Sequence, residues 1–276
     1  MSWPALSESS RITDWSYFQT KNYLNHPCDI DLFCSEHPEV DGAVIRFVWP
    51  SGVKDSKYDY YYDGFTRNGK IVMGYGWPNP KKTVKQVVDD WLKAMGDRVP
   101  KVIFGDWEEV STFEGKTPSQ LADHMKALNA EKQRRIPDAV HGEYGRGGWL
   151  DANVRASDEI RKYYWWLAHW PWWPPDFKDQ AHSFSELDSF LPIDNNFTPY
   201  RGKVVTIPVA SVVGWQATSE LHNYVPRGRN LDGGYFTNAF LNPIYGGAGP
   251  VEPPPTAEKA IVEVKVVQGE AEIKVI

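Results

Sequence analysis

The segment that most constrains the fold is residues 101–109, in which an apolar run leads directly into Asp-x-Glu. The residues before Asp106 are apolar and partly β-branched, which is typical of a buried strand. Side chains alternate along a strand, so Asp106 and Glu108 are expected on one side and Trp107 on the other. Two carboxylates at the mouth of a buried strand are costly for folding unless they are paired or used. The segment is therefore either a strand fraying into a solvated acidic loop or a strand that presents a functional acid pair.

Length, charge and composition bound the class of protein. A chain of 276 residues can form one large α/β barrel or two modest domains. Its net charge of −6 argues against nucleic acid as a partner, and no run approaches the roughly 18 apolar residues of a membrane span. The 13 tryptophans favour carbohydrate binding, because rigid aromatic faces stack on sugar rings, although core packing also uses such residues.

The cysteine content predicts neither a metal site nor an extensive disulfide framework. Cys28 and Cys34 are the only cysteines, and two thiolates would need two further ligands to hold a metal ion. A local disulfide is one interpretation of this pair. Two free thiols are the interpretation that we prefer.

Strand and helix patterns alternate through the first part of the chain. Strands are expected at residues 11–16, 42–48, 70–76, 101–108, 139–144 and 163–169, and helices at residues 58–68, 83–95, 118–133 and 153–162. This alternation predicts a parallel sheet with right-handed crossovers. Later strands are expected at residues 204–207 and 212–216, and a further strand is expected to end at residues 231–234, without crossover helices between them. We therefore predict an α/β fold, an irregular TIM-like (β/α) barrel whose last strands lack crossover helices.

The C-terminal part of the chain has a different composition. Residues 246–258 are rich in Gly and Pro, which is typical of a linker, and residues 259–276 alternate between apolar and charged side chains around Gln-Gly. The predicted organisation is a barrel at residues 1–245, this linker, and a β-hairpin appendage. A hairpin alone is marginally stable, so we expect it to dock onto the barrel or to pair with another chain.

Acidic residues occur at the predicted ends of three strands. Asp14 lies toward the end of the first strand, Asp106 and Glu108 close the fourth, and Asp232 belongs to the last. The carboxyl ends of parallel barrel strands meet on one face, where barrel enzymes carry their chemistry. We therefore expect these four carboxylates to converge on one rim.

Over residues 11–242 the ordered motifs resemble the glycoside hydrolase family 25 lysozymes, the Chalaropsis-type muramidases. The early matches are Asp14-Trp15-Ser16, Val44-Ile45-Arg46, Gly74-Tyr75-Gly76-Trp77-Pro78 and the signature Asp106-Trp107-Glu108. The later matches are Trp166-Leu167-Ala168, Trp215-Gln216-Ala217-Thr218-Ser219, and Leu231-Asp232 followed by Asn238-Ala239-Phe240. The chain departs from the family pattern at residues 47–50, where Phe-Val-Trp-Pro replaces the usual small, Thr- or Ser-containing strand end.

The resemblance implies cleavage of the β-1,4 bond between N-acetylmuramic acid and N-acetylglucosamine, with no metal or cofactor. Glu108 is then the general acid, which agrees with its acidic neighbour and tryptophan-rich surroundings, since both raise proton affinity. Asp106 is expected to be ionised, either stabilising the transition state or orienting the substrate's N-acetyl group. Asp14 and Asp232 are expected to shape the electrostatics and to hold sugar hydroxyls.

Candidate glycan-binding residues lie at or just past the predicted strand ends. They are Tyr75, Trp77, Tyr144, Trp170, Trp215 and Arg46. Core packing is an equally good interpretation for the aromatic residues. A structural salt bridge is an equally good interpretation for Arg46.

The predicted function is phage-type lysis of the cell wall by a muramidase that acts on peptidoglycan glycan strands. Two alternatives stay open: an inert wall-binding or virion structural module of the same fold, and a hydrolase of another amino sugar polymer such as chitin. The first ten residues lack the basic and apolar regions of a classical signal peptide. We therefore expect synthesis in the host cytoplasm and holin-released or virion-associated action at the wall, with the hairpin as a contact to a phage particle or to a second copy.

Overall fold

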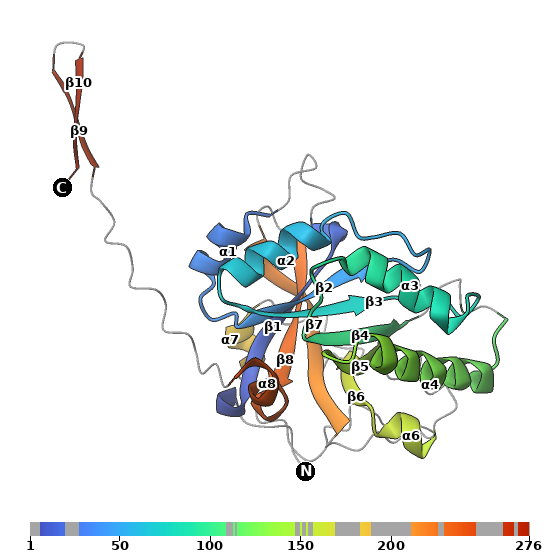
Figure 1. Cartoon of the computed structure of the whole chain (residues 1–276). Coiled ribbons are helices and arrows are strands. Elements are labelled where there is room, and N and C mark those ends of the chain that lie inside the picture. The colour runs from blue at the N-terminus through green and yellow to red at the C-terminus, as the bar shows by residue number, and fades with distance from the viewer. Residues whose placement is uncertain are drawn as a thin grey trace.

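The computed structural model describes residues 6–19, 28–108, 113, 115–146, 150, 153, 157–168, 183–188, 211–225, 229–246, 262–267 and 270–275. Its centre is a closed barrel in which strands β1 to β8 follow one another in chain order (Figure 1). The strands are β1 Ser9–Trp15, β2 Gly42–Val48, β3 Ile71–Gly76, β4 Val102–Trp107, β5 Val140–Arg146, β6 Tyr164–Ala168, β7 Val212–Val225 and β8 Arg229–Thr237. This architecture confirms the predicted irregular α/β barrel.

The helices lie on the outside of the barrel and at one end of it (Figure 1). The α-helices are α1 Ile30–Glu36, α2 Tyr58–Arg67, α3 Val84–Met95, α4 Pro118–Arg135, α6 Asp158–Arg161, α7 Phe184–Asp188 and α8 Asn238–Tyr245, and short 3-10 turns occur at Leu6–Glu8 (η1) and Tyr17–Gln19 (η2). Thr83 and Thr117 each form a capping box at the start of α3 and α4, because Gln86 and Gln120 follow them three positions later. The helix predicted at 153–162 is shorter, because Ser157 caps a separate turn that begins at Asp158.

Strand direction is where the structure departs most from the prediction. Neighbours from β1 to β7 pair in parallel, whereas β8 runs antiparallel to both β7 and β1. The prediction that β8 ends near Gly234 is wrong, because the strand continues to Thr237. A Cβ on Gly233 would lie 2.3 Å from Leu221, and one on Gly234 would lie 1.9 Å from the carbonyl oxygen of Trp215. These glycines therefore allow β7 to approach closely, and they do not form a turn.

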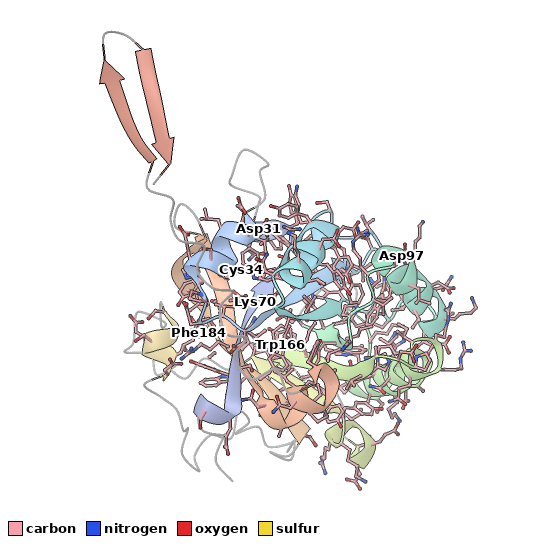
Figure 2. All side chains as sticks on the ribbon, turned by 60° about the vertical axis from the view of Figure 1, so that its left-hand side comes forward. Asp31, Cys34, Lys70, Asp97, Trp166 and Phe184 are labelled. Atoms are coloured by element: carbon pink, nitrogen blue, oxygen red, sulfur yellow. The ribbon has the colours of Figure 1, made fainter. Side chains whose placement is uncertain are left out.

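Alternating side chains divide the core into two layers. The inner layer fills the barrel and includes Val44, Met73, Phe104, Phe236 and Trp166, which is labelled in Figure 2. The outer layer lies between the strands and the helices and includes Trp15, Trp91, Trp107, Trp165 and Trp215. Helix α8 contributes Phe240 and Leu241 to the inner layer, so it closes the barrel at the end where β8 finishes and β1 begins. The sequence does not predict this helix, since Pro243 lies inside it.

The structure also bears on the cysteines, the C-terminal hairpin, membrane-spanning helices and the strand predicted at 204–207. Cys28 and Cys34 are free and buried, and burial raises the pKa of Cys28 to about 12 and that of Cys34 to about 11. Strands β9 Val262–Val267 and β10 Glu270–Val275 pair antiparallel as the predicted hairpin. Among the described residues, no helix has the length and apolarity that crossing a membrane requires. The strand predicted at 204–207 lies outside the described residues.

Candidate active site

An open cavity of about 250 Å³ lies at the carboxyl ends of the parallel strands. All four predicted acids line it. The full set of lining residues is Asp14, Ser16, Phe18, Gln19, Arg46, Tyr75, Trp77, Asp106, Glu108, Tyr144, Trp166, Gln216 and Asp232. The barrel therefore brings together acids that are up to 218 positions apart, from Asp14 to Asp232.

Strand β4 places the acid pair as its alternation predicts. Asp106 and Glu108 line the cavity, whereas Trp107 lies in the outer core layer. The indole Nε1 of Trp107 donates a hydrogen bond of 2.8 Å to Glu143 Oε2 on the outer side of β5. The anchored indole between them fixes the backbone that carries both carboxylates.

Asp232 reaches the site by cross-strand pairing. The structure corrects its predicted position, because it lies within the antiparallel strand β8 directly opposite Asp14 of β1. Gln216 Nε2 donates a hydrogen bond of 2.9 Å to Asp232 Oδ2, and the Tyr144 hydroxyl donates one of 2.8 Å to Gln216 Oε1. Two hydrogen bonds between side chains thus connect β5, β7 and β8 at the cavity.

Burial raises the pKa of all four acids. For Asp14 the next largest cause is the charge of Asp232, and for Asp106 and Asp232 it is the charge of Glu108. The pKa of Asp232 rises to about 7. For Glu108 burial raises the pKa, while hydrogen bonding to Tyr144 and the charge of Arg146 lower it. The cluster therefore holds protons at pH values where isolated carboxylates are ionised.

Asp106 differs from the expectation that it is simply ionised. Burial and the charge of Glu108 hold its pKa well above the ordinary value, and its Oδ1 atom has no hydrogen-bond partner among the described residues. The charge of Arg46 offsets part of the rise for both Asp106 and Asp14. Asp106 thus presents an unsatisfied oxygen to the cavity.

Arg46 combines the two roles that the sequence left open. It lines the cavity, and its Nε donates a hydrogen bond of 2.9 Å to Asp55 Oδ2, with Nη2 2.8 Å from the same oxygen. Both side chains of this ion pair are buried. Arg46 is therefore a fixed positive charge at the edge of the acid cluster.

The structure sorts the other predicted glycan-binding residues. Tyr75, Trp77 and Tyr144 line the cavity. Trp215 does not: it is fully buried and stacks on Tyr235 with ring centroids 5.9 Å apart, so it offers no face to a ligand. Its neighbour Gln216 faces the cavity, because adjacent strand residues point to opposite sides. Trp170 lies outside the described residues.

Five lining residues were not predicted as site residues: Ser16, Phe18, Gln19, Trp166 and Gln216. Alternation from the buried Trp215 could have indicated Gln216. The η2 turn that carries Phe18 and Gln19 has no comparable periodic signal. Within the described ranges, no group of three or more His, Cys, Asp or Glu residues is arranged as a metal site.

Solved structures of other proteins share this architecture. The bacterial lysozyme from Streptomyces coelicolor superposes with a TM-score of 0.59 at 14% identity, over 87% of this chain and 98% of that one. For a family GH25 lysozyme from Aspergillus fumigatus the TM-score is 0.57 at 16% identity, over 87% and 100%. A family 25 glycosyl hydrolase from Bacillus anthracis gives 0.56 at 12% identity, over 82% and 88%.

The chain has the family 25 glycoside hydrolase fold. The resemblance carried by the sequence motifs is thereby confirmed at the level of architecture. No protein-family model matches the sequence, and no curated protein matches it either. At these identities the fold is shared while most side chains differ, so the chemistry of this family 25-type barrel has to be argued from its own cavity.

Proposed function

We propose that the chain is a peptidoglycan hydrolase, an N-acetylmuramidase that cleaves the β-1,4 bond between N-acetylmuramic acid and N-acetylglucosamine. The observation that carries the proposal is the acid pair Asp106 and Glu108, which faces a cavity at the carboxyl end of this barrel. Structural neighbours support the substrate class. The autolysin LytC from Streptococcus pneumoniae, with a TM-score of 0.53 and 16% identity over 83% of this chain and 46% of that one, was solved in complex with a synthetic peptidoglycan ligand.

Glu108 is the general acid in this proposal. Burial raises its pKa, which favours the protonated form that a general acid needs. It gives this proton to the glycosidic oxygen, the bond from that oxygen to the anomeric carbon breaks, and the bonding electrons leave with the oxygen. The resulting Glu108 carboxylate then takes a proton from the water that completes hydrolysis.

The positive charge that develops on the sugar requires a nearby negative charge. The charge of Arg46 offsets part of the rise that burial and the neighbouring acids cause in the pKa of Asp106 and of Asp14, and this favours negative charge at these two carboxyls. Asp106 serves either as the group that stabilises the sugar cation directly or as the group that orients the substrate's N-acetyl oxygen for attack. On the part of the cavity formed by β7 and β8, a hydrogen bond of 2.9 Å between Gln216 and Asp232 fixes both side chains.

The biological role that we propose is lysis of the bacterial cell wall of the phage endolysin type. The catalytic domain of endolysin ply40, from a bacteriophage of Listeria monocytogenes, shares the fold with a TM-score of 0.54 and 15% identity, over 86% of this chain and 97% of that one. Release from the producing cell by a second protein, or transport on a virion, belongs to the same proposal.

Purified cell walls provide the test. Wild-type protein should reduce the turbidity of the wall suspension and release fragments whose new reducing end is N-acetylmuramic acid. Glu108→Gln should lower the rate about a thousandfold or more, because the leaving oxygen loses its proton donor. Glu36→Gln, an exposed residue of α1, is the matched control and should keep full activity.

The outcomes separate the alternatives. Lysis that survives Glu108→Gln would refute the assignment of the acid. Wall binding without lysis by the wild type would favour the inert module, and cleavage of chitin in preference to peptidoglycan would favour the other amino sugar polymer.

A further inference from the structure

Three aromatic side chains stand together where three consecutive strands end. Phe18 follows β1, Trp49 follows β2, and Trp77 follows β3. The rings of Phe18 and Trp49 pack edge to face with centroids 5.5 Å apart, and those of Trp49 and Trp77 do so at 6.2 Å. Phe18 and Trp77 line the cavity. We refer to Phe18, Trp49 and Trp77 as the aromatic wall.

Buried polar contacts hold this wall in place. The guanidinium of Arg46 lies 3.4 Å from the centroid of the Trp49 ring and 5.0 Å from that of Phe18. Asp55 Oδ2 accepts hydrogen bonds from Arg46 Nε at 2.9 Å and from the backbone nitrogen of Tyr17 at 3.1 Å. One carboxylate therefore fixes both the cation beneath Trp49 and the turn that carries Phe18.

The η2 turn is also fixed from within. Gln19 Oε1 accepts hydrogen bonds from the backbone nitrogen of Ser16 at 2.6 Å and from its hydroxyl at 3.1 Å. A wall held in this way loses little conformational entropy when a ligand stacks on it, which is the condition for efficient binding.

The exposure of the wall indicates the class of ligand. Phe18 is 41% exposed although it is a large apolar residue beside an acidic cavity. The indole Nε1 of Trp77 is buried without a hydrogen-bond partner among the described residues. Arg46 is already paired with Asp55, so the wall offers no free positive charge to an anion. An uncharged pyranose ring, with C–H groups on its faces and hydroxyls at its edge, matches this combination of surfaces.

We propose that the aromatic wall is a sugar subsite, in which Phe18 and Trp77, the members that line the cavity, stack one ring of the glycan strand beside the scissile bond while Trp49 packs against both of them. The inference rests on the proposed function and assigns a role to two residues outside the predicted site. The wall lies at the ends of β1 to β3, whereas Glu108 and Tyr144 come from β4 and β5. A ring on the wall would thus occupy the side of the cavity next to the acids, with the bond to be cleaved extending toward Glu108.

The test uses the full chain and a soluble, peptide-free glycan strand prepared from peptidoglycan. Binding is measured by calorimetry in the Glu108→Gln background, which prevents turnover. Phe18→Ala should weaken binding about fivefold to tenfold, since an aromatic contact is lost. Phe18→Leu should weaken it nearly as much, because it keeps apolar volume but removes the flat face. Trp49→Phe should show a smaller loss of about twofold to threefold.

Two further measurements make the result specific. In the active protein Phe18→Ala should raise KM while kcat changes less than about twofold, as expected when a contact is equally strong in the ground and transition states. Tyr60→Ala is the matched control, because Tyr60 is 42% exposed on α2 and does not line the cavity. Thermal melting confirms that each variant is folded.

Unchanged affinity in folded Phe18→Ala and Phe18→Leu would overturn the subsite while leaving the proposed function intact, provided that the wild type cleaves the strand. A wild type that neither binds nor cleaves it would overturn both. Loss in Phe18→Ala but not in Phe18→Leu would also overturn stacking, since apolar contact alone would then explain binding.

Discussion

Carboxylates occur on the outer and on the inner face of the sheet at strands β4 and β5. The two sets differ in how completely their charges are paired. On the outer face Glu143 is fully buried and fully paired. Its oxygens accept hydrogen bonds of 2.8 Å from Lys132 Nζ, Asn129 Nδ2 and Trp107 Nε1. On the inner face Asp106 and Glu108 share a cavity with two further acids. Burial raises the pKa of both, and for Asp106 the charges of Glu108 and Asp14 raise it further.

The difference shows that the outer face of the sheet holds a stabilising ion pair, whereas the inner face holds the candidate catalytic acids. A buried charge with a complete set of partners behaves as part of the scaffold, whereas like charges gathered without compensation hold protons that can be transferred. Gly105 makes room for the outer carboxylate, because a Cβ at that position would lie 2.3 Å from Glu143 Oε2. The outer network therefore stabilises the strand that carries the inner acids.

The largest effect is expected from breaking the outer pair. Lys132→Met leaves Glu143 charged and buried without its cation, which should lower the free energy of unfolding by about 3–5 kcal/mol. The double variant Lys132→Met/Glu143→Gln removes the uncompensated charge and should recover much of that loss. Urea denaturation measures both.

Arg134 serves as the control for this prediction, since it pairs with Glu131 on the exposed side of the same helix. Arg134→Met should leave the midpoint of denaturation unchanged. A double variant no more stable than Lys132→Met would contradict the view that charge compensation is what the outer network supplies.

An intermediate effect is expected from relieving one inner charge. The pKa of Asp232 in the folded protein is about 7, against an ordinary value of 3.8. The folded state therefore holds the proton more tightly than the unfolded state, and stability falls as the pH rises from about 4 to about 7. Asp232→Asn removes this titration and keeps an acceptor for Gln216. It should increase the free energy of unfolding by about 1–3 kcal/mol near pH 8 and have little effect near pH 4.

Denaturation curves at both pH values check this sign. Asp97→Asn is the control, because Asp97 is exposed just past the end of α3 (Figure 2) and does not line the cavity. Destabilisation by Asp232→Asn near pH 8 would mean that the inner charge is compensated after all. Activity should fall at both pH values, because residues of a functional site commonly lower the stability of the fold.

The smallest effect is expected on the pKa of Glu108. The Tyr144 hydroxyl has one proton, which it shares between Gln216 Oε1 and Glu108, and its hydrogen bonding lowers the pKa of Glu108. Tyr144→Phe should therefore raise that pKa and move the alkaline limb of the activity profile to higher pH, by less than about one unit. Tyr75→Phe removes a hydroxyl that bonds to Asp14 instead, so it should leave this limb in place. A shift toward lower pH in Tyr144→Phe would reverse the assigned role of the hydroxyl.

Local sequence patterns predicted much of the site where a single strand carries the information. Alternation in β4 placed Asp106 and Glu108 inward and Trp107 outward, as the structure confirms. The same rule applied from Trp215 would have indicated Gln216. Phe18 escaped prediction because it lies in a short turn, whose position depends on Asp55 beyond the next strand.

By itself the sequence determined the alternation of strands β1 to β5 with helices α2, α3 and α4, the caps of α3 and α4, and the face on which the acid pair lies. These features depend on side chains within a few positions of one another, through alternation and capping hydrogen bonds. Only the tertiary structure decided that β8 runs antiparallel, that Asp232 lies opposite Asp14, and that Glu143 is paired while Asp106 Oδ1 has no partner in the part of the chain that the structure describes. Strand direction, cross-strand register and burial bring together residues far apart in the chain, and these contacts set the charge of the site.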